Sequence, residues 1–407
     1  MKCPFSAHSA PLRVLRGKAV PGPLRLESGT SPTSKLSVRH YRKSLRYIVV
    51  GSLLLLSGCA VHSWENGPAP EAGCRDAVAR TEGTEVRWHL PMETEDRERL
   101  DRWCAPVGSP VVLAATGLAA TGHLDSLAVI SWNSHVGGGD LTRLVGDLRA
   151  GQLTGGVPLR HFVLLLQEVH RADARLPRAV AGARVPSRVE GVPATGDRRD
   201  IVTTARELGL SLYYVPSMRN GVELSPEPAE DRGNAILSTL PLSQLRAIEL
   251  PFEAQRRVAV AATIRGSGRD GEWKLQLTSA HLDTRSTGSR VLASLGAGRR
   301  RQAEGLLMGL QGEVPAVVAG DLNTWSLEPL ESAVPFLRAH FPQTPIAPEE
   351  ATFSTGWGYS RRLDHMFFRL PGGWLARYAR VDDRYGSDHH PLLAWVVPGG
   401  AELLAAR

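Results

Sequence analysis

The stretch Ala316-Val317-Val318-Ala319-Gly320-Asp321-Leu322-Asn323 indicates the fold class. Four consecutive apolar residues are typical of a strand that other layers cover on both faces. A glycine, an acid and an amide follow, and the alternation of an extended chain places Asp321 and Asn323 on the same side. A carboxylate and an amide so placed can orient water and hold a phosphate oxygen. In isolation, the same motif could equally be a turn rich in Asp and Asn.

Five further apolar runs end in the same way, with an acid, an amide or a histidine. They are Trp132-Asn133, Gln167-Glu168, His281-Leu282-Asp283, Leu363-Asp364-His365 and Ser387-Asp388-His389-His390. If these strand ends converge on one edge, they can share a divalent cation and a phosphate. Oxygen ligands dominate and no cysteine contributes, which favours a hard ion such as Mg²⁺, with Mn²⁺ or Ca²⁺ as substitutes, over a two-histidine zinc site.

The order of these motifs resembles the endonuclease/exonuclease/phosphatase superfamily, which includes deoxyribonuclease I, bacterial sphingomyelinases and inositol polyphosphate 5-phosphatases. The resemblance extends from about Ile130 to Trp395 and includes Arg232-Gly233-Asn234-Ala235-Ile236-Leu237-Ser238. It implies an α/β fold, specifically a four-layer α/β sandwich of the deoxyribonuclease I type. Two central, mainly antiparallel β-sheets would be flanked by helices, with the site at one end of the sheets.

The resemblance also implies metal ligands and phosphate contacts. The divalent ion would be bound by Asn133 and Glu168, with Asp388 completing the metal or water network. Arg232 and Asn234 would contact the substrate phosphate.

The remaining implied roles are catalytic. Asp321 would orient or deprotonate the attacking water, while Asn323 and His281 would hold the phosphate. Asp364 would pair with His389 and fix its tautomer. The resemblance does not decide whether His389 acts in its protonated form or as a general base.

The excess of basic over acidic residues in the chain is concentrated in its N-terminal part. It has 407 residues with a net charge of +7, but residues 1–59 hold ten of the 48 Lys and Arg and one of the 41 acids. The rest carries slightly more acids than bases, so charge alone does not indicate a polyanionic partner.

The N-terminal part resembles a bacterial export signal. Four basic residues, Arg39 to Arg46, precede an uncharged stretch, Tyr47 to Gly58, that is too short to span a bilayer stably. It ends in Leu56-Ser57-Gly58-Cys59, which resembles a lipobox with Cys59 as the lipidated residue. The alternative is a short buried helix with a chance cysteine. We therefore expect an exported lipoprotein of the bacterial cell envelope, anchored to a membrane and facing the periplasm or exterior.

Three regions follow from these patterns: a leader and signal peptide (1–59), a tether and accessory lead-in (60–126) and a catalytic domain (127–400). In an oxidising compartment, Cys74 and Cys104 could form a disulfide, although two unpaired thiols would give the same sequence. Periodicity predicts strands at Leu127–Trp132, Phe162–Leu166 and Trp273–Thr278, helices at Leu141–Ala150 and Arg299–Gln311, and loops at Ala181–Asp200 and Leu224–Asp231.

These features predict a monomeric, metal-dependent phosphodiester hydrolase that acts like a nuclease on DNA or RNA. Two alternatives remain: a phospholipid or sphingomyelin phosphodiesterase, and a binding lipoprotein on the same fold without catalysis. The loop aromatics Trp325, Trp357 and Tyr359 could stack on a base or enter lipid. The sequence has no clearly apolar hairpin, which places the lipid substrate second.

Overall fold

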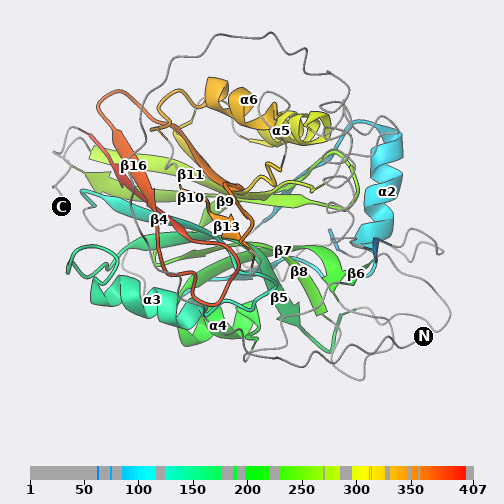
Figure 1. Cartoon of the computed structure of the whole chain (residues 1–407), viewed down its shortest axis with the longest axis horizontal. Coiled ribbons are helices and arrows are strands. Elements are labelled where there is room, and N and C mark those ends of the chain that lie inside the picture. Colours follow the sequence, from blue (N-terminus) through cyan, green and yellow to red (C-terminus); the bar gives the residue numbers. More distant parts are fainter. Residues whose placement is uncertain are drawn as a thin grey trace, which may run out of the picture. The chain divides into compact units, whose positions relative to one another are not determined.

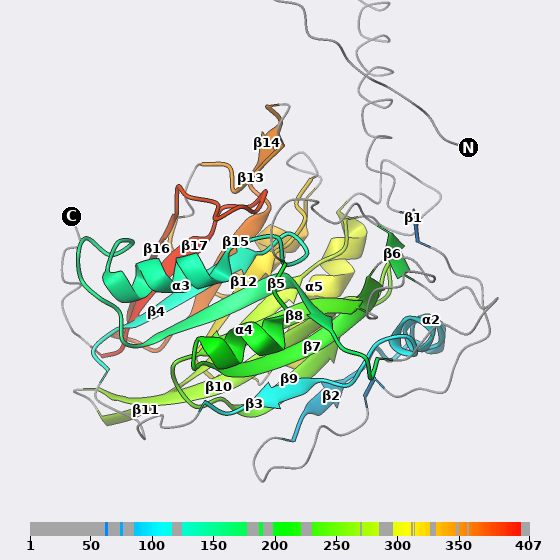
Figure 2. The ribbon, with the colours of Figure 1, turned by 90° about the horizontal axis from the view of Figure 1, so that it is seen from below.

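In the computed structural model, the described helices and strands all lie in the unit Val61–Arg407. The described residues are 62–63, 74–75, 85–115, 124–176, 187–189, 198–220, 230–268, 271–284, 296–310, 312, 314–325, 331–346, 350–355 and 358–399. Two large β-sheets lie face to face in this unit, as Figures 1 and 2 show.

The larger sheet has nine strands and mixed pairing. In spatial order they are β1 (His62–Ser63), β6 (Ser187–Val189), β7 (Ser211–Asn220), β8 (Glu230–Ser238), β5 (Phe162–Ala172), β4 (Leu127–Asn133), β17 (Leu392–Val397) and β16 (Leu375–Arg380), with β3 (Val111–Leu113) paired to β7. The central strands β4 and β5 are parallel, whereas β8 is antiparallel to its two neighbours, β5 and β7.

The smaller sheet has six strands. Their order is β15 (Asp364–Arg369), β12 (Ala316–Asp321), β11 (Gly271–His281), β10 (Val258–Gly268), β9 (Ser243–Glu249) and β2 (Arg87–His89). Strands β11 and β12 are parallel, and β15 is antiparallel to β12. A separate two-stranded hairpin consists of β13 (Phe353–Ser354) and β14 (Ser360–Arg361).

Helices cover the outer faces of both sheets and produce four layers. The larger sheet packs against α3 (Leu141–Ala150) and α4 (Ile201–Glu207), and the smaller sheet against α5 (Ala297–Gly309) and α6 (Ala333–His340). A third apolar cluster, which includes Val129, Leu165 and Val317, fills the space between the sheets. The expected four-layer α/β sandwich, with mainly antiparallel sheets, is therefore confirmed.

The lead-in segment joins the edges of both sheets. Strand β3 pairs with β7 in the larger sheet, and β2 pairs with β9 in the smaller one. Helix α2 (Thr94–Cys104) lies between these two strands in sequence and buries Leu100 and Trp103. No helix among the residues with described placement is both long and apolar enough to cross a membrane.

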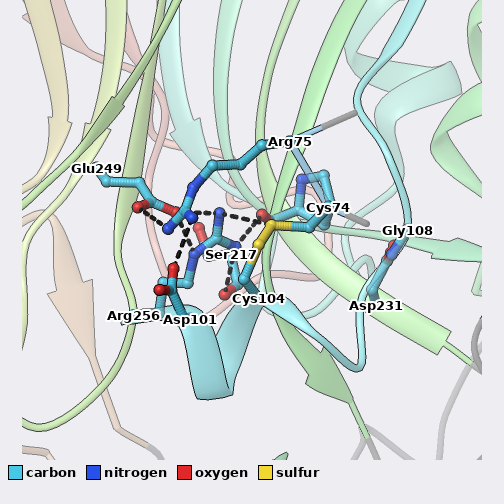
Figure 3. Close-up of a disulfide and its surroundings, with 10 residues drawn as sticks. Cys74, Arg75, Asp101, Cys104, Gly108, Ser217, Asp231, Glu249 and Arg256 are labelled. Atoms are coloured by element: carbon cyan, nitrogen blue, oxygen red, sulfur yellow. Dashed lines mark hydrogen bonds and ion pairs between the residues drawn. A yellow bond between two sulfur atoms is a disulfide. The ribbon is translucent and has the colours of Figure 1, made fainter. Parts of the chain in front are cut away.

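A disulfide between Cys74 and Cys104 connects the start of this lead-in to the end of α2. The disulfide lies beside a buried ion pair between Arg256 and Glu249. Arg256 is fully buried, and its Nε donates to Glu249 Oε1 at 2.6 Å. Figure 3 shows Arg256 between this carboxylate and the sulfur of Cys74, to which its Nη2 donates at 3.4 Å. Arg75 adds a second cation, whose Nη2 donates to Glu249 Oε2 at 2.5 Å.

Several predicted elements need correction. The loop prediction for Ala181–Asp200 is wrong at Ser187–Val189, which form β6, and the loop expected to reach Asp231 ends earlier because β8 begins at Glu230. The alternation of apolar and polar residues in Trp273–Thr278 is typical of a strand with one solvent-facing side, but only Lys274 is exposed there. Gln276 and Thr278 are buried, because they lie on the face of the smaller sheet that α5 and α6 cover.

Candidate active site

Strand pairing brings the predicted site residues to one end of the two sheets. In the larger sheet, the parallel strands β4 and β5 are paired up to Asn133, the last residue of β4, which lies opposite Gln167 in β5. In the smaller sheet, Asp321 lies opposite His281 on one side and opposite Asp364 on the other. Because the carboxyl ends of parallel strands share an edge, residues far apart in the sequence become neighbours.

Gly320 permits the close approach of β12 to β11. Its φ is +150°, and a Cβ at this position would lie 1.8 Å from the carbonyl oxygen of Ala280. Any other residue would therefore move β12 away from β11. Gly320 thus sets the spacing between the strands that carry Asp321 and His281.

Glu168 does not end its strand, as the sequence suggested, but lies in a bulge within it. The register of β5 against β8 shifts between Leu166 and Val169, and the φ of Glu168 is +54°. A left-handed conformation is strained for a residue with a side chain and is concentrated at functional sites. The bulge redirects the Glu168 side chain, because a β-bulge breaks the regular alternation of a strand.

Asp321 is the centre of the cluster. Its Oδ2 accepts a hydrogen bond from Asn133 Nδ2 at 3.0 Å and lies 3.4 Å from His281 Nε2 and 3.8 Å from His389 Nε2. Its Oδ1 accepts a hydrogen bond from the backbone N–H of Asn323 at 2.8 Å. One carboxylate therefore contacts side chains from both sheets, and it is only 2% exposed.

His281 connects Asp321 with Glu168. Its Nε2 lies 3.9 Å from Glu168 Oε1, on the same side as Asp321. On the other side of the ring, Arg257 Nη1 lies 3.1 Å from His281 Nδ1. A guanidinium can only donate, so Nδ1 accepts this bond and the ring proton is on Nε2, facing the two carboxylates.

His389 is held from three directions. Its Nδ1 lies 2.8 Å from Asp364 Oδ2, its backbone N–H donates to Ser387 Oγ at 3.0 Å, and its carbonyl oxygen accepts from the indole of Trp132 at 3.1 Å. Ser387 Oγ in turn donates to the carbonyl oxygen of Asn133 at 2.7 Å. The loop that carries His389 is therefore attached to the end of β4.

The surroundings of His389 and Asp321 raise the pKa values of both side chains. Burial by itself lowers the pKa of His389, but the carboxylates of Asp364, Asp321 and Asp388 outweigh it and raise this pKa to about 10. Burial raises the pKa of Asp321 to about 7, with a smaller contribution from Asp364, although the positive charge on His389 opposes this change. At neutral pH, His389 is protonated, and Asp321 can accept a proton.

The other predicted residues lie around this centre. Arg232 is buried, with its Nη1 3.7 Å from Oε2 of Glu168, a predicted metal ligand. Asp388 lies at the solvent-exposed rim, with Oδ1 3.6 Å from His135 Nδ1 and 4.0 Å from His389 Nε2.

Two residues that were predicted to contact the substrate phosphate, Asn323 and Asn234, use their side-chain amides in hydrogen bonds within the protein. Asn323 donates from Nδ2 to the carbonyl oxygen of Leu282 at 2.9 Å and accepts the indole N–H of Trp325 at 2.8 Å. Asn234 donates to the carbonyl oxygen of Val258 at 2.8 Å and so connects the two sheets. Cys59 and Trp357 lie outside the described residues.

Arg257 is a site residue that the sequence did not indicate. It follows Arg256 directly before an apolar strand, and nothing in that pattern assigns either arginine a partner. The function of Asp283 was also not apparent. Its Oδ2 accepts the backbone N–H groups of Ala254 and Gln255 at 2.8 Å each, so Asp283 anchors the turn that precedes Arg257.

The donor atoms near Glu168 fit a hard divalent cation. The Glu168 side chain is 11% exposed, and Asn133 Oδ1 accepts one backbone hydrogen bond, from His135 at 3.0 Å, which leaves a second lone pair. Among the described residues, one group of His, Cys, Asp and Glu side chains has its possible metal-ligand atoms within 4.8 Å of one another. This group is Cys74, Cys104 and Glu249, which lie away from Glu168 at the disulfide. Its two sulfurs are already joined, so it offers no thiolate ligands. A metal at the site would therefore rely on few protein oxygens and keep positions for water and phosphate, as Mg²⁺ does.

Comparisons with known proteins agree with this arrangement of motifs. The sequence profile described as the Endonuclease/Exonuclease/phosphatase family matches residues 130–389. No curated protein matches the chain significantly.

Three solved structures are similar to this one. The crystal structure of an endonuclease/exonuclease/phosphatase from Beutenbergia cavernae DSM 12333 is 20% identical, with a TM-score of 0.45 over 69% of this chain and 74% of that chain. The human Nocturnin catalytic domain with bound sulfate is 16% identical, with a TM-score of 0.38 over 68% and 96% of the two chains. A humanized D. rerio TDP2 is 17% identical, with a TM-score of 0.37 over 67% and 99%.

Proposed function

The chain belongs to the endonuclease/exonuclease/phosphatase family, and on this premise we propose that it is a metal-dependent phosphodiesterase that hydrolyses nucleic acid. The observation that carries the proposal is the environment of Asp321. Its buried carboxylate lies within 4 Å of side-chain nitrogens of Asn133, His281 and His389. A binding protein without catalysis would not need a carboxylate of raised proton affinity beside a protonated imidazole.

Asp321 is the group that accepts the proton of the attacking water. Its pKa of about 7 allows it to be ionised at neutral pH and still take up a proton. His281 presents its Nε2–H on the same side of the site and donates it to a phosphoryl oxygen. Glu168 and Asn133 are the residues that would hold the cation, which when bound would neutralise charge on the phosphoryl and leaving oxygens.

His389 acts in its protonated form on the attacking side of the phosphate. In-line displacement places the attacking and leaving oxygens on opposite sides of phosphorus. His389 Nε2 and Asp321 Oδ2 are 3.8 Å apart, which is too close for them to serve the two opposite ends. We therefore assign His389 to stabilising the charge on Asp321 and on the phosphoryl oxygens, and not to protonating the leaving group.

We also propose that the enzyme works outside the cytoplasm, attached to a membrane through Cys59. The basic cluster, the short uncharged stretch and the terminal cysteine of the leader support this proposal. The disulfide between Cys74 and Cys104 supports it independently, because disulfides persist mainly in oxidising compartments. Radiolabelled palmitate in bacteria that express the full chain should label the wild type and not Cys59→Ala. Equal labelling of the two would exclude the anchor.

Substrate assays test the catalytic proposal. Purified protein is offered plasmid DNA, RNA and sphingomyelin vesicles, each with Mg²⁺ and with EDTA. Cleavage of nucleic acid is expected with Mg²⁺ only, and Asp321→Asn should lower the rate by at least 100-fold. Activity that survives both EDTA and this substitution would exclude the proposed site, and exclusive cleavage of sphingomyelin would exclude the proposed substrate.

Glu168→Gln tests the metal ligand. The substitution keeps the size of the side chain but removes its charge, so the Mg²⁺ concentration for half-maximal activity should rise by about 10- to 100-fold. Glu207→Gln is a matched control, because Glu207 is exposed and pairs with Arg199 on the surface. An unchanged Mg²⁺ requirement in Glu168→Gln would place the cation elsewhere.

A further inference from the structure

A row of three aromatic side chains leads from His389 to the surface. The ring of Phe353 lies 5.0 Å from the imidazole of His389, and the ring of Trp325 lies 5.2 Å from Phe353. Tyr359 follows, with its ring 6.0 Å from that of Trp325 and only 13° from parallel to it. Phe353 is 9% exposed and Tyr359 is 40% exposed, so the aromatic row (Phe353, Trp325 and Tyr359) opens outward from the catalytic histidine.

The aromatic row is fixed in position by the residues of the site. The Trp325 indole donates to Asn323 Oδ1 at 2.8 Å, and Asn323 lies two residues after Asp321, the last residue of β12. Phe353 pairs through its backbone with His389, and Tyr359 directly precedes β14 of the β13–β14 hairpin, which projects upward in Figure 2. The backbone N–H of Thr355 donates to the carbonyl oxygen of Tyr359 at 2.8 Å. A planar group of a bound substrate would therefore meet a surface that needs little reorganisation.

Two exposed arginines flank the aromatic row. The guanidinium carbon of Arg361 lies 4.7 Å from the centre of the Tyr359 ring, and Arg384 Nη1 donates to Ser354 Oγ at 2.8 Å. A quaternary ammonium such as choline also binds aromatic faces. Here, however, the positively charged guanidinium of Arg361 already lies over the Tyr359 ring and would repel it. A nucleobase is neutral and planar, and it stacks on aromatic rings and on guanidinium planes alike. Its neighbouring phosphates would in addition be attracted by the arginines.

We propose that the aromatic row is a nucleobase-stacking subsite that holds the base beside the scissile phosphate. The proposal rests on the proposed phosphodiesterase function and narrows its substrate class to nucleic acid with an unpaired base next to the cleaved bond. Stacking requires an accessible base face, so single strands and frayed ends should be preferred to intact duplex.

Binding to a catalytically inactive protein tests the subsite separately from hydrolysis. In the Asp321→Asn background, with Mg²⁺ present, calorimetry gives the Kd of the dinucleotide thymidylyl-(3′,5′)-thymidine and of two analogues, each lacking one thymine. Loss of one of the two thymines should weaken binding by about 5- to 100-fold, while loss of the other has a smaller effect. Tyr359→Ala should weaken binding of the complete dinucleotide to a similar extent and abolish the discrimination, whereas Tyr359→Phe, which keeps the ring, should retain it.

The outcomes distinguish failure of the proposed stacking subsite from failure of the proposed phosphodiesterase activity. Equal binding of all three dinucleotides, or Tyr359→Ala equal to Tyr359→Phe, would overturn the subsite even if the wild type cleaves nucleic acid. Discrimination that depends on Tyr359 would support the subsite even if the wild type cleaved nothing. Glycerophosphocholine is the competing probe, and a Kd for it that rises in Tyr359→Ala while the dinucleotide Kd does not would identify a choline site instead. Equal melting temperatures of the Tyr359 variants would exclude misfolding as the cause.

Discussion

Asp364 Oδ2 lies 2.8 Å from Nδ1 of His389, and both side chains are buried. Burial lowers the pKa of His389, but the charge of Asp364 and its hydrogen bond raise it to about 10. Asp364→Asn removes the charge and keeps the shape, so the pKa of His389 should fall. The alkaline limb of the pH profile of kcat should then move to lower pH, and kcat at pH 8 should fall by about 100-fold or more.

Asp382→Asn is the control for this prediction. Asp382 is a surface acid whose side chain is 93% exposed and pairs with Arg380, so its loss should leave the pH profile unchanged. A lower kcat in Asp364→Asn with an unchanged alkaline limb would mean that Asp364 only orients His389 and does not set its proton affinity.

Asp321 should decrease the stability of the metal-free protein at neutral pH. Its pKa is raised from 3.8 to about 7, chiefly by burial, so the folded state binds the proton more tightly than the unfolded state. The stability that this proton provides is complete below pH 3.8 and is lost as the pH rises through 7. In EDTA, Asp321→Asn should therefore become more stable relative to the wild type between pH 4 and pH 8.

Urea unfolding of both proteins across this pH range measures the difference. Asp382→Asn is the control and should follow the wild type, because its side chain is 93% exposed and an exposed ion pair contributes little to stability. A difference between Asp321→Asn and the wild type that does not change with pH would show that Asp321 does not titrate in this range.

The sequence predicted the fold and the centre of the site from strand ends, because hydrophobic runs and the polar residues that follow them are local features. Asn133 and Asp321 are the last residues of β4 and β12, and His389 lies in the loop before β17, so the three meet as expected at one end of the two sheets. The bulge at Glu168 was missed, because a continuous apolar run up to Leu166 does not show where a strand shifts register. The strand at Ser187–Val189 was missed because its surroundings are rich in Gly, Pro and Arg.

Partners of buried charges could not be predicted in the same way. Arg256 and Arg257 are adjacent in sequence, but one faces Glu249 and Cys74 while the other faces His281. Alternation along the chain explains why they diverge. It does not specify what each side meets, because the partners come from residues between 7 and 182 positions away.

Glu249 should be critical for stability because it is the shared partner of two arginines. It accepts hydrogen bonds from Arg256 at 2.6 Å and Arg75 at 2.5 Å, and it is 1% exposed. Glu249→Gln leaves the guanidinium of Arg256 buried without a compensating charge, which typically costs about 3–5 kcal/mol of unfolding free energy. The free energy of unfolding in urea should fall by about this amount.

Glu95→Gln provides the comparison for Glu249. Glu95 pairs with Arg99 at 2.6 Å on α2, but its side chain is 76% exposed. An exposed pair four residues apart on a helix contributes only about 0.3–0.5 kcal/mol. If Glu249→Gln cost no more than Glu95→Gln, the buried cluster would be neutral to stability, and the disulfide and apolar contacts would have to hold the lead-in segment.

Arg257 should determine the orientation of His281 and hence part of the catalytic rate. Its Nη1 lies 3.1 Å from His281 Nδ1, and both residues are buried. In Arg257→Leu, the imidazole loses the donor that keeps its Nε2–H directed at Asp321, so kcat should fall by about 10- to 1,000-fold. KM should change much less, because Arg257 faces His281 and not the opening of the site.

A double-mutant cycle distinguishes this positioning effect from general damage. If Arg257 acts through His281, then Arg257→Leu should add little to the loss of kcat in His281→Gln, because the oriented ring is already absent. Arg265→Leu is the matched control, since Arg265 is exposed on β10, the strand that begins directly after Arg257, and its loss should leave kcat unchanged. Losses that multiply in the double variant would show that Arg257 contributes independently of His281, for example by contacting the phosphate itself.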